Sequence, residues 1–136
     1  MFENTDKTSL NELGEFGLIQ HLTQAVELTQ SSTIKGIGDD AAVLDFANKK
    51  TLISTDLLLE GIHFDLRYVP LKHLGYKAVQ VNLSDIYAMN GIASQITFSI
   101  GLSSKFPLEA VEEIYEGALI ACKKFGVDLI GGDTSA

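Results

Sequence analysis

Apolar residues recur along this chain at two spacings, one typical of helices and one typical of strands. Residues 1–14 are mostly polar and indicate a flexible amino-terminal arm. The arm leads into residues 12–28, where apolar side chains recur every three or four positions. We expect a short amphipathic helix there, followed by a polar break at 30–33.

Two strand patterns follow this break. A glycine-punctuated turn within residues 36–44 runs into a short apolar strand. A second run begins at Thr51, is interrupted by Ser54-Thr55-Asp56, and continues through apolar residues to Phe64. Residues 48–50 between the two runs are typical of a hairpin turn, so we expect these strands to pair antiparallel.

The second half of the chain shows two long helical patterns, each followed by a strand pattern. Asn90-Gly91 and Gly126 are typical helix stops. The last strand pattern leads to a turn at residues 131–134. The expected elements are a helix at 71–89, a strand at 95–102, a helix at 107–125 and a short strand at 127–130.

The order of these elements predicts an α+β fold, with a mixed, mainly antiparallel β-sheet and helices packed on one face. The chain stops soon after the turn at 131–134, which looks like the beginning of a site, and no closing helix follows. We therefore expect residues 15–136 to be the amino-terminal domain of a longer, two-domain protein.

Composition narrows the class of protein. A chain that is 46% hydrophobic and 21% charged has enough apolar residues for one buried core. Its net charge of -8 argues against nucleic-acid binding, which needs a basic face. The single cysteine, Cys122, excludes an intrachain disulfide. No apolar run has the length of a membrane span and no signal peptide is visible, so we expect a cytoplasmic protein without a membrane partner.

Several acids lie at predicted strand ends, turns or helix faces. They are Asp39, Asp40, Asp56, Asp85 and Asp133. If four of them converge at a spacing of about 5 Å, each pair repels by roughly 3 kcal/mol at an effective dielectric constant of 20. Bound cations would offset this repulsion, and oxygen ligands without a histidine and cysteine cluster favour Mg²⁺ over zinc. A polyphosphate is the natural partner of such a metal site.

Two of these acids also have simpler interpretations. Asp56 could turn a strand end into solvent, and Asp85 could cap the join between its helix and the next loop. Asn82 falls on the same helical face as Asp85 and is a candidate hydrogen-bond partner for it. The glycine turns at 36–38 and 131–132 would let backbone N–H groups approach phosphate, but neither is a P-loop, and each alone is weak evidence.

Four segments in register resemble the amino-terminal domain of the thiamine-monophosphate kinase family. They are GIGDDAAVL (36–44), STDLLLEGIHF (54–64), YKAVQVNLSDIYAMNG (76–91) and LIGGDTS (129–135). The second segment favours this family over its relatives, the aminoimidazole-ribonucleotide synthetases, the selenophosphate synthetases and the hydrogenase-maturation proteins. Asn90 stands where the family pattern has glycine.

The resemblance implies transfer of the γ-phosphoryl group of ATP to thiamine monophosphate, giving thiamine diphosphate in thiamine diphosphate biosynthesis. It also implies a homodimer paired through the amino-terminal domains, and no catalytic nucleophile. Asp39 is the less favoured of its pair, since adjacent residues of an extended turn point apart. The metal ligands implied for several Mg²⁺ ions are Asp40, Ser54, Thr55, Asp56, Asp85 and Asp133.

The resemblance also implies ligand contacts. Tyr115, Gly132 and Asp133 would bind the nucleotide, and His63 would contact thiamine monophosphate. Tyr115 could instead be an ordinary core residue of its helix, and His63 an ordinary polar residue at the end of the strand. Two other functions stay open. One is another ATP-using member of the superfamily, and the other is a non-catalytic nucleotide-binding dimerisation module.

Overall fold

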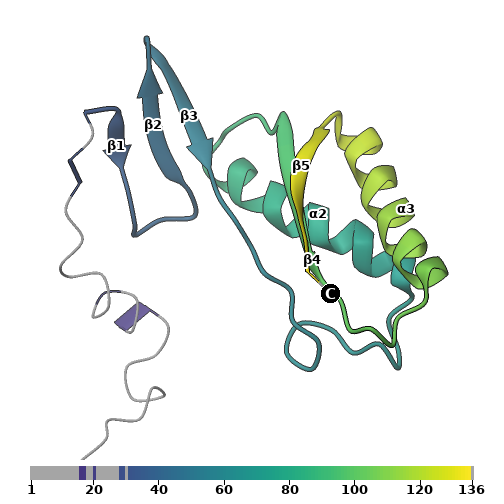
Figure 1. The fold of residues 1–136 in the computed structure, drawn as a ribbon. Coiled ribbons are helices and arrows are strands. Elements are labelled where there is room, and N and C mark those ends of the chain that lie inside the picture. Colours follow the sequence, from purple (N-terminus) through teal and green to yellow (C-terminus); the bar gives the residue numbers. More distant parts are fainter. Residues whose placement is uncertain (1–15, 18–19, 21–27, 30, 136) are drawn as a thin grey trace, which may run out of the picture.

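The computed structural model describes residues 16–17, 20, 28–29 and 31–135. The predicted arm and most of the predicted helix at 12–28 lie outside these residues. The described elements form a three-stranded antiparallel sheet and a helix-covered pair of parallel strands (Figure 1). In chain order they are β1 (Thr33–Lys35), β2 (Ala42–Phe46), β3 (Lys49–Ile53), α2 (Leu71–Ala88), β4 (Gln95–Gly101), α3 (Leu108–Phe125) and β5 (Asp128–Ser135).

The predicted hairpin is confirmed, with its turn placed slightly earlier. β2 and β3 pair antiparallel from Ala42↔Ile53 to Phe46↔Lys49. The turn is Ala47-Asn48, whose φ angles of 52° and 69° are those of the tight two-residue turns that suit the twist of a hairpin. β1, which pairs with β2, was not predicted, because it begins in the polar break that follows the predicted helix at 12–28.

The run beyond Thr51 leaves the sheet early. β3 ends at Ile53, and residues 54–59 have no regular secondary structure. The interpretation of Asp56 as a residue beyond a strand end is therefore correct for the local structure. The Asp56 side chain is exposed, but its backbone is held by a side chain of α2.

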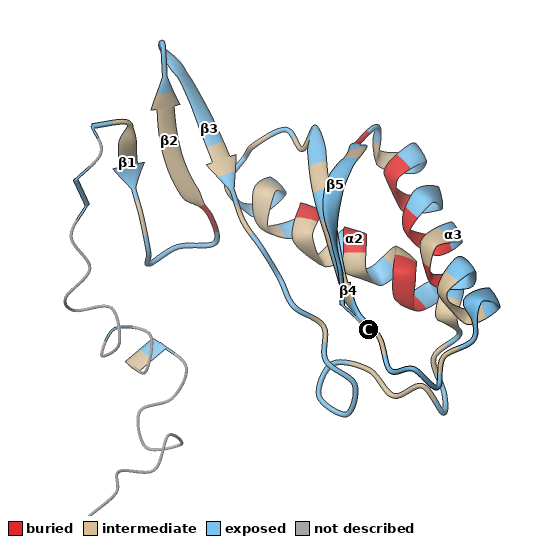
Figure 2. Ribbon diagram, viewed as in Figure 1, coloured by how far each residue is buried: buried red, intermediate tan, exposed pale blue. Residues whose placement is uncertain are grey.

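Helices α2 and α3 pack on each other and cover one face of β4 and β5 (Figure 1). Figure 2 shows most of the buried residues on these two helices. Two glycines permit the close approach. A Cβ atom at Gly75 would lie 1.8 Å from the Ile114 carbonyl oxygen, and one at Gly117 would lie 1.8 Å from the Lys72 carbonyl oxygen. The buried core consists of Val79, Leu83, Ala118, Ala121, Cys122 and Val127.

The predicted alternation in β4 is confirmed: Ile96, Phe98 and Ile100 are half-buried and the residues between them are exposed. The prediction that the last strand ends at 130 is wrong. β5 continues to Ser135, parallel to β4, with one irregularity in register after Ile96. The ladder of hydrogen bonds to β4 keeps the glycine pair extended, so the expected turn at 131–134 does not form.

The α+β class and the mainly antiparallel pairing are confirmed, and among the described residues the strands divide between two sheets. The helix stops are confirmed too: Gly126 has a left-handed φ of 65°, and Asn90, in place of the family's glycine, has a φ of 57°. Asparagine tolerates this conformation better than most residues. Neither α2 nor α3 combines the length and apolar character that crossing a membrane requires.

Candidate functional site

Three side chains of α2 hold the irregular segment that follows β3. Asn82 Oδ1 accepts a hydrogen bond of 2.7 Å from the Asp56 backbone N–H. At one end, Ser54 Oγ lies 2.8 Å from Asp85 Oδ2. At the other end, Lys77 Nζ donates to the His63 carbonyl oxygen at 2.8 Å. The segment therefore runs antiparallel to α2 and has its order from helix side chains rather than from a strand ladder.

This arrangement places Asp56 and Asp85 in one pocket of about 430 Å³, which we call the acidic pocket. Its lining is Asp56, Gln80, Val81, Ser84 and Asp85. Burial of the Asp56 carboxyl and the negative charge of Asp85 raise the pKa of Asp56, while His63 opposes this shift. Two carboxylates thus face a common space and repel each other there.

Asp40 reaches the same region through its main chain. The Ser54 hydroxyl is 2.8 Å from the Asp40 carbonyl oxygen as well as from Asp85, and its single hydrogen can serve one of them at a time. Asp39 is engaged elsewhere, because it is hydrogen-bonded and ion-paired to Lys35, which lowers the pKa of Asp39. This pairing favours Asp40 over Asp39 as a ligand, which stays a prediction.

His63 is oriented by its own loop. Its Nδ1 atom accepts a hydrogen bond of 2.9 Å from the Leu59 N–H. In the neutral ring the hydrogen is therefore on Nε2. The ring is exposed, so Nε2 can donate to an anionic group in solution. His63 is not simply the end of a strand, since β3 ended ten residues before it.

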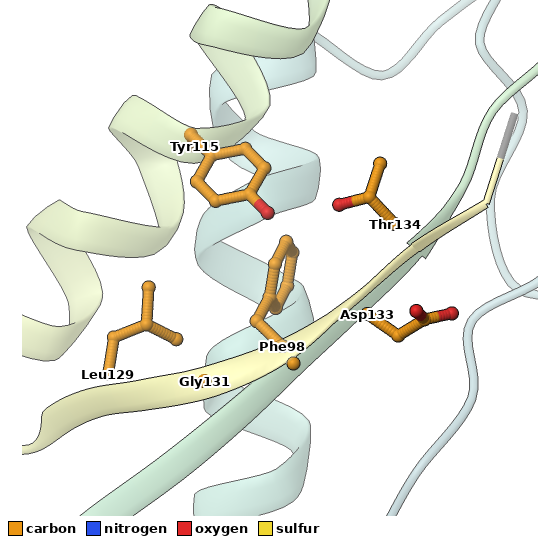
Figure 3. A pocket seen from close by; sticks show the side chains of 7 residues that line it. Phe98, Tyr115, Leu129, Gly131, Asp133 and Thr134 are labelled. Atoms are coloured by element: carbon orange, nitrogen blue, oxygen red, sulfur yellow. The ribbon is translucent and has the colours of Figure 1, made fainter.

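A second pocket, which we call the strand pocket, has a volume of about 460 Å³ and lies between β5 and α3 (Figure 3). Its lining is Phe98, Tyr115, Leu129, Gly131, Gly132, Asp133 and Thr134. The Tyr115 ring meets Phe98 edge to face, with centroids 5.4 Å apart, and its hydroxyl is directed toward the side of Thr134 (Figure 3). Tyr115 therefore both packs against the core and lines a pocket.

The two glycines of β5 differ in what surrounds them. Gly132 has a φ of 153°, and a Cβ atom there would lie 1.9 Å from the Phe98 carbonyl oxygen. A Cβ atom at Gly131 would have nothing within 4 Å. Gly132 is thus required by the close approach of β4, whereas the bare backbone at Gly131 opens onto the strand pocket.

The expected cluster of four carboxylates does not form within the described residues. They contain no group of three or more histidine, cysteine or acidic side chains close enough to hold one metal ion together. Asp133 lines the strand pocket, where the Ser135 hydroxyl donates to it at 3.1 Å, while Asp56 and Asp85 line the acidic pocket. Asp133 is separated from the other two acids because it lies on β5, whereas the Asp56 backbone is hydrogen-bonded to α2.

The pair in the acidic pocket nevertheless suits Mg²⁺. This ion is usually bound through one or two carboxylates, and water and phosphate oxygens complete its octahedron. Asp56 and Asp85 provide two carboxylates, and Ser54 provides a neutral oxygen beside them. Thr55 is exposed and makes no side-chain hydrogen bond to the described residues.

Sequence patterns gave the wrong partner for one residue that builds this site and missed another. Asn82 was a candidate partner for Asp85, but it bonds the Asp56 N–H through Oδ1 and the Ala78 carbonyl oxygen through Nδ2. Lys77 was not singled out at all. Helical spacing shows that residues 77, 78, 82 and 85 lie near one side of α2, but it cannot show which loop atoms they meet.

Comparison with known proteins supplies a family. The family model for AIR synthase related protein, N-terminal domain, matches residues 38–136. The thiamine-monophosphate kinase of Aquifex aeolicus (strain VF5) is 38% identical over 126 residues, which cover 93% of this chain and 39% of that enzyme. The thiamine-monophosphate kinase of Bacillus subtilis (strain 168) is 38% identical over 123 residues, covering 90% of this chain and 38% of that enzyme.

Solved structures agree with this result. The structure of AaThiL complexed with AMPPCP and TMP superimposes with a TM-score of 0.82 at 36% identity, covering 96% of this chain and 40% of that one. A crystal structure of a Thermus thermophilus protein has a TM-score of 0.79 at 28% identity, covering 93% and 41%. This chain thus spans about 40% of the length of the proteins it matches.

Proposed function

The chain belongs to the AIR synthase related protein family, and we propose that it is the ATP- and Mg²⁺-binding amino-terminal domain of a thiamine-monophosphate kinase. The observation that carries the proposal is the acidic pocket, in which Asp56 and Asp85 come together from segments 29 residues apart in sequence. Relatives that carry the name thiamine-monophosphate kinase support the choice of substrate. The whole activity is assigned to a longer protein, in which a carboxy-terminal domain follows residues 15–136.

The proposed metal ligands are Asp40, Ser54, Thr55, Asp56, Asp85 and Asp133. Asp56 and Asp85 form the centre of the set, because they face one pocket and repel each other without a cation. When bound, Mg²⁺ would neutralise charge on the transferred phosphoryl group. Asp133, in the strand pocket, would meet a different ion or a different phosphate of the same nucleotide.

Nucleotide contacts are assigned to the strand pocket. Tyr115 offers a ring face and a hydroxyl, and Asp133 offers a carboxylate for a metal-bound phosphate. Gly132 lies in the pocket wall, but its missing side chain is already explained by Phe98. The open backbone at Gly131 is the better candidate for a close approach of phosphate. The complex of AaThiL with AMPPCP supports an ATP-type ligand for this fold.

His63 is assigned to the acceptor substrate. Its exposed Nε2–H is a hydrogen-bond donor, and Lys77 and Leu59 fix the loop that carries it. The acceptor is itself a phosphate anion, so no side chain needs to remove a proton or form a covalent phosphoryl-enzyme. The protein's contribution is to position two anionic substrates and hold the cations between them.

We also propose that the protein is a homodimer paired through these domains. The three-stranded sheet leaves large apolar side chains exposed on β1, β2 and β3, among them Ile34, Phe46 and Ile53. Exposed apolar side chains of this kind are covered in stable assemblies. A second copy of the chain is the proposed cover.

An assay of the complete protein tests the function. Purified protein is incubated with Mg²⁺ and ATP together with thiamine monophosphate, with selenide, or with neither. We expect thiamine diphosphate and ADP to form in equal amounts in the first reaction only. ATP consumption that requires selenide would move the protein to the selenophosphate branch of the family. Nucleotide binding without turnover of either substrate would favour a non-catalytic module.

A further inference from the structure

We propose that Asn82 is a positioning residue: its side-chain amide fixes the backbone at Asp56 so that the Asp56 carboxylate stands beside Asp85 in the acidic pocket. The inference rests on the proposed function to the extent that this pocket binds a divalent cation. It assigns no contact between Asn82 and the metal or a substrate. Asn82 lies outside the proposed ligand set, and it would control how tightly that set binds a divalent cation.

The geometry at Asn82 uses both ends of the amide. Oδ1 accepts from the Asp56 N–H at 2.7 Å, and Nδ2 donates to the Ala78 carbonyl oxygen at 2.9 Å. A backbone N–H can only donate and a carbonyl oxygen can only accept, so the amide has one orientation here. Aspartate could not donate to Ala78, and alanine could make neither bond. The half-buried Asn82 side chain is therefore matched to its two partners.

The position of Asp56 depends on few other contacts. No strand ladder reaches Asp56, because β3 ends at Ile53. Within the described residues, the next side-chain bonds from α2 to this segment are at Ser54 and at the His63 carbonyl oxygen. Asn82 lies three residues before Asp85, which places the two side chains on the same side of α2. A bond from residue 82 to the Asp56 backbone thus brings the two carboxylates to one site.

The repulsion between the two carboxylates acts against this position of Asp56. Asp56 and Asp85 repel each other, and a segment without regular structure can relieve the repulsion by moving away from the helix. Loss of the Asn82 bond would allow this movement, and the cation would then have to draw Asp56 back before both carboxylates could bind it. One net hydrogen bond corresponds to about a fivefold change in a binding constant.

The experiment measures Mn²⁺ binding to the complete protein by calorimetry, with Mn²⁺ as the probe for Mg²⁺, because both favour octahedral oxygen sites. The variants are Asn82→Ala, Asp56→Asn and the double variant. We expect Asn82→Ala to weaken Mn²⁺ binding about fivefold, and to have no further effect when Asp56 is already Asn. Losses that multiply in the double variant would show that Asn82 acts independently of Asp56, and would overturn the proposal.

Amide hydrogen exchange gives a second readout that does not need metal or substrate. Asn82→Ala should raise exchange at the Asp56 amide while the core helices keep their protection. A general rise in exchange with unchanged Mn²⁺ affinity would mean that Asn82 serves stability alone, and would overturn the proposal. Asn48→Gly is the matched control, since Asn48 lies in the exposed hairpin turn, away from the pocket, and glycine accepts its positive φ. It should leave both the Mn²⁺ affinity and the Asp56 amide unchanged.

These results separate the inference from the proposed function. If the wild-type protein binds Mn²⁺ through Asp56 but makes no thiamine diphosphate, the proposed activity fails and the role of Asn82 stands. If Asp56→Asn leaves Mn²⁺ binding unchanged, the acidic pocket is not the metal site and the inference fails with it.

Discussion

The acidic pocket and the strand pocket are built by opposite means. In the acidic pocket, Ser54, Asn82 and Lys77 hold an irregular segment against α2 with side-chain hydrogen bonds. In the strand pocket, the parallel ladder of β4 and β5 holds the wall through backbone atoms, and Gly132 has no room for a side chain. This difference indicates where changes of function and changes of stability are separable. We therefore expect that single polar residues of the acidic pocket can be changed without unfolding the protein, whereas changes in the wall of the strand pocket disturb the fold itself.

Buried residues are also distributed unequally between the two sides of the acidic pocket. The core lies between α2, α3 and the strand pair, where Val79, Ala118 and Ala121 are fully buried. On the other side of the acidic pocket, Ala41 is the one buried residue of the described chain before α2. The acidic pocket thus joins a well-packed unit to a sheet with little core of its own. Its carboxylates are supported from the α2 side.

The largest effect that we predict comes from the acidic pocket. Asp56→Asn or Asp85→Asn should reduce turnover of the complete protein by at least about a thousandfold, equivalent to about 4 kcal/mol of transition-state stabilisation. The fold should stay intact, because amide and carboxylate have nearly the same shape and removing one charge relieves repulsion. Turnover is measured as thiamine diphosphate formed, and the fold by thermal unfolding without metal.

Asp45→Asn is the matched control for this prediction. Asp45 is an acid of β2, its side chain is outside both pockets, and its substitution should leave turnover within twofold of wild type. Turnover within tenfold of wild type for both pocket variants would remove the metal assignment. The acidic pocket would then have no role in catalysis that distinguishes it from the strand pocket.

The second prediction concerns the strand pocket. Gly132→Ala should lower the free energy of unfolding by about 3 kcal/mol or more, because the new Cβ atom would collide with the Phe98 carbonyl oxygen. Gly131→Ala should change it by less than about 0.5 kcal/mol, since its Cβ atom meets open space. Urea unfolding of both variants measures the difference.

The same two variants sharpen the nucleotide assignment. Gly131→Ala should stay folded and weaken binding of an ATP analogue about tenfold, because the added methyl group occupies the space into which a phosphate would fit. Binding equal to that of wild type would place the nucleotide elsewhere. Equal stability of the two alanine variants would mean that β4 and β5 are not as close as described, and that the two pockets are not built differently.

Much of the framework could be predicted from the sequence, because helices and tight turns follow local rules. The alternation in β4 and the stops at Asn90 and Gly126 were predicted and are confirmed. The segment after Ile53 could not be placed, because its conformation depends on side chains of α2 that lie more than twenty residues further along the chain. The continuation of β5 through Gly131 and Gly132 was missed for a similar reason, since pairing with β4 overrides the turn preference of glycine.

In the candidate site, too, contacts between residues distant in sequence could not be predicted. Residue types correctly pointed to Asp56 and Asp85 as acids that come together. Asp133 lines the strand pocket instead, because the pairing of β5 with β4, which the sequence does not reveal, decides which pocket Asp133 faces. Its role as a metal ligand stays a prediction. The role of Asn82 could not be found by spacing alone, since its partner is a backbone N–H rather than another side chain.

The smallest predicted effect is a pH dependence specific to the acidic pocket. Asp56 has an ordinary pKa of 3.8, and burial and Asp85 raise the pKa of Asp56 in the folded protein. The folded state therefore binds this proton more tightly than the unfolded state, so ionised Asp56 lowers stability. This cost is present in full above the raised pKa, declines as the pH falls through it, and is gone below 3.8. In the absence of metal, Asp56→Asn should thus be slightly more stable than wild type at pH 7.

The difference in stability between wild type and Asp56→Asn isolates the contribution of the Asp56 carboxyl. Asp39 and Asp65 have pKa values lowered by Lys35 and Arg67, so their contributions to stability have the opposite sign and are lost as the pH falls through those lowered values. Both groups are present in wild type and variant, and their effects cancel when unfolding midpoints in urea with EDTA are subtracted. The advantage of Asp56→Asn should shrink between pH 7 and pH 4. An advantage for wild type at pH 7 would mean that Asp56 is stabilised by an unseen partner rather than strained by Asp85, and that the acidic pocket is built as much for stability as the strand pocket.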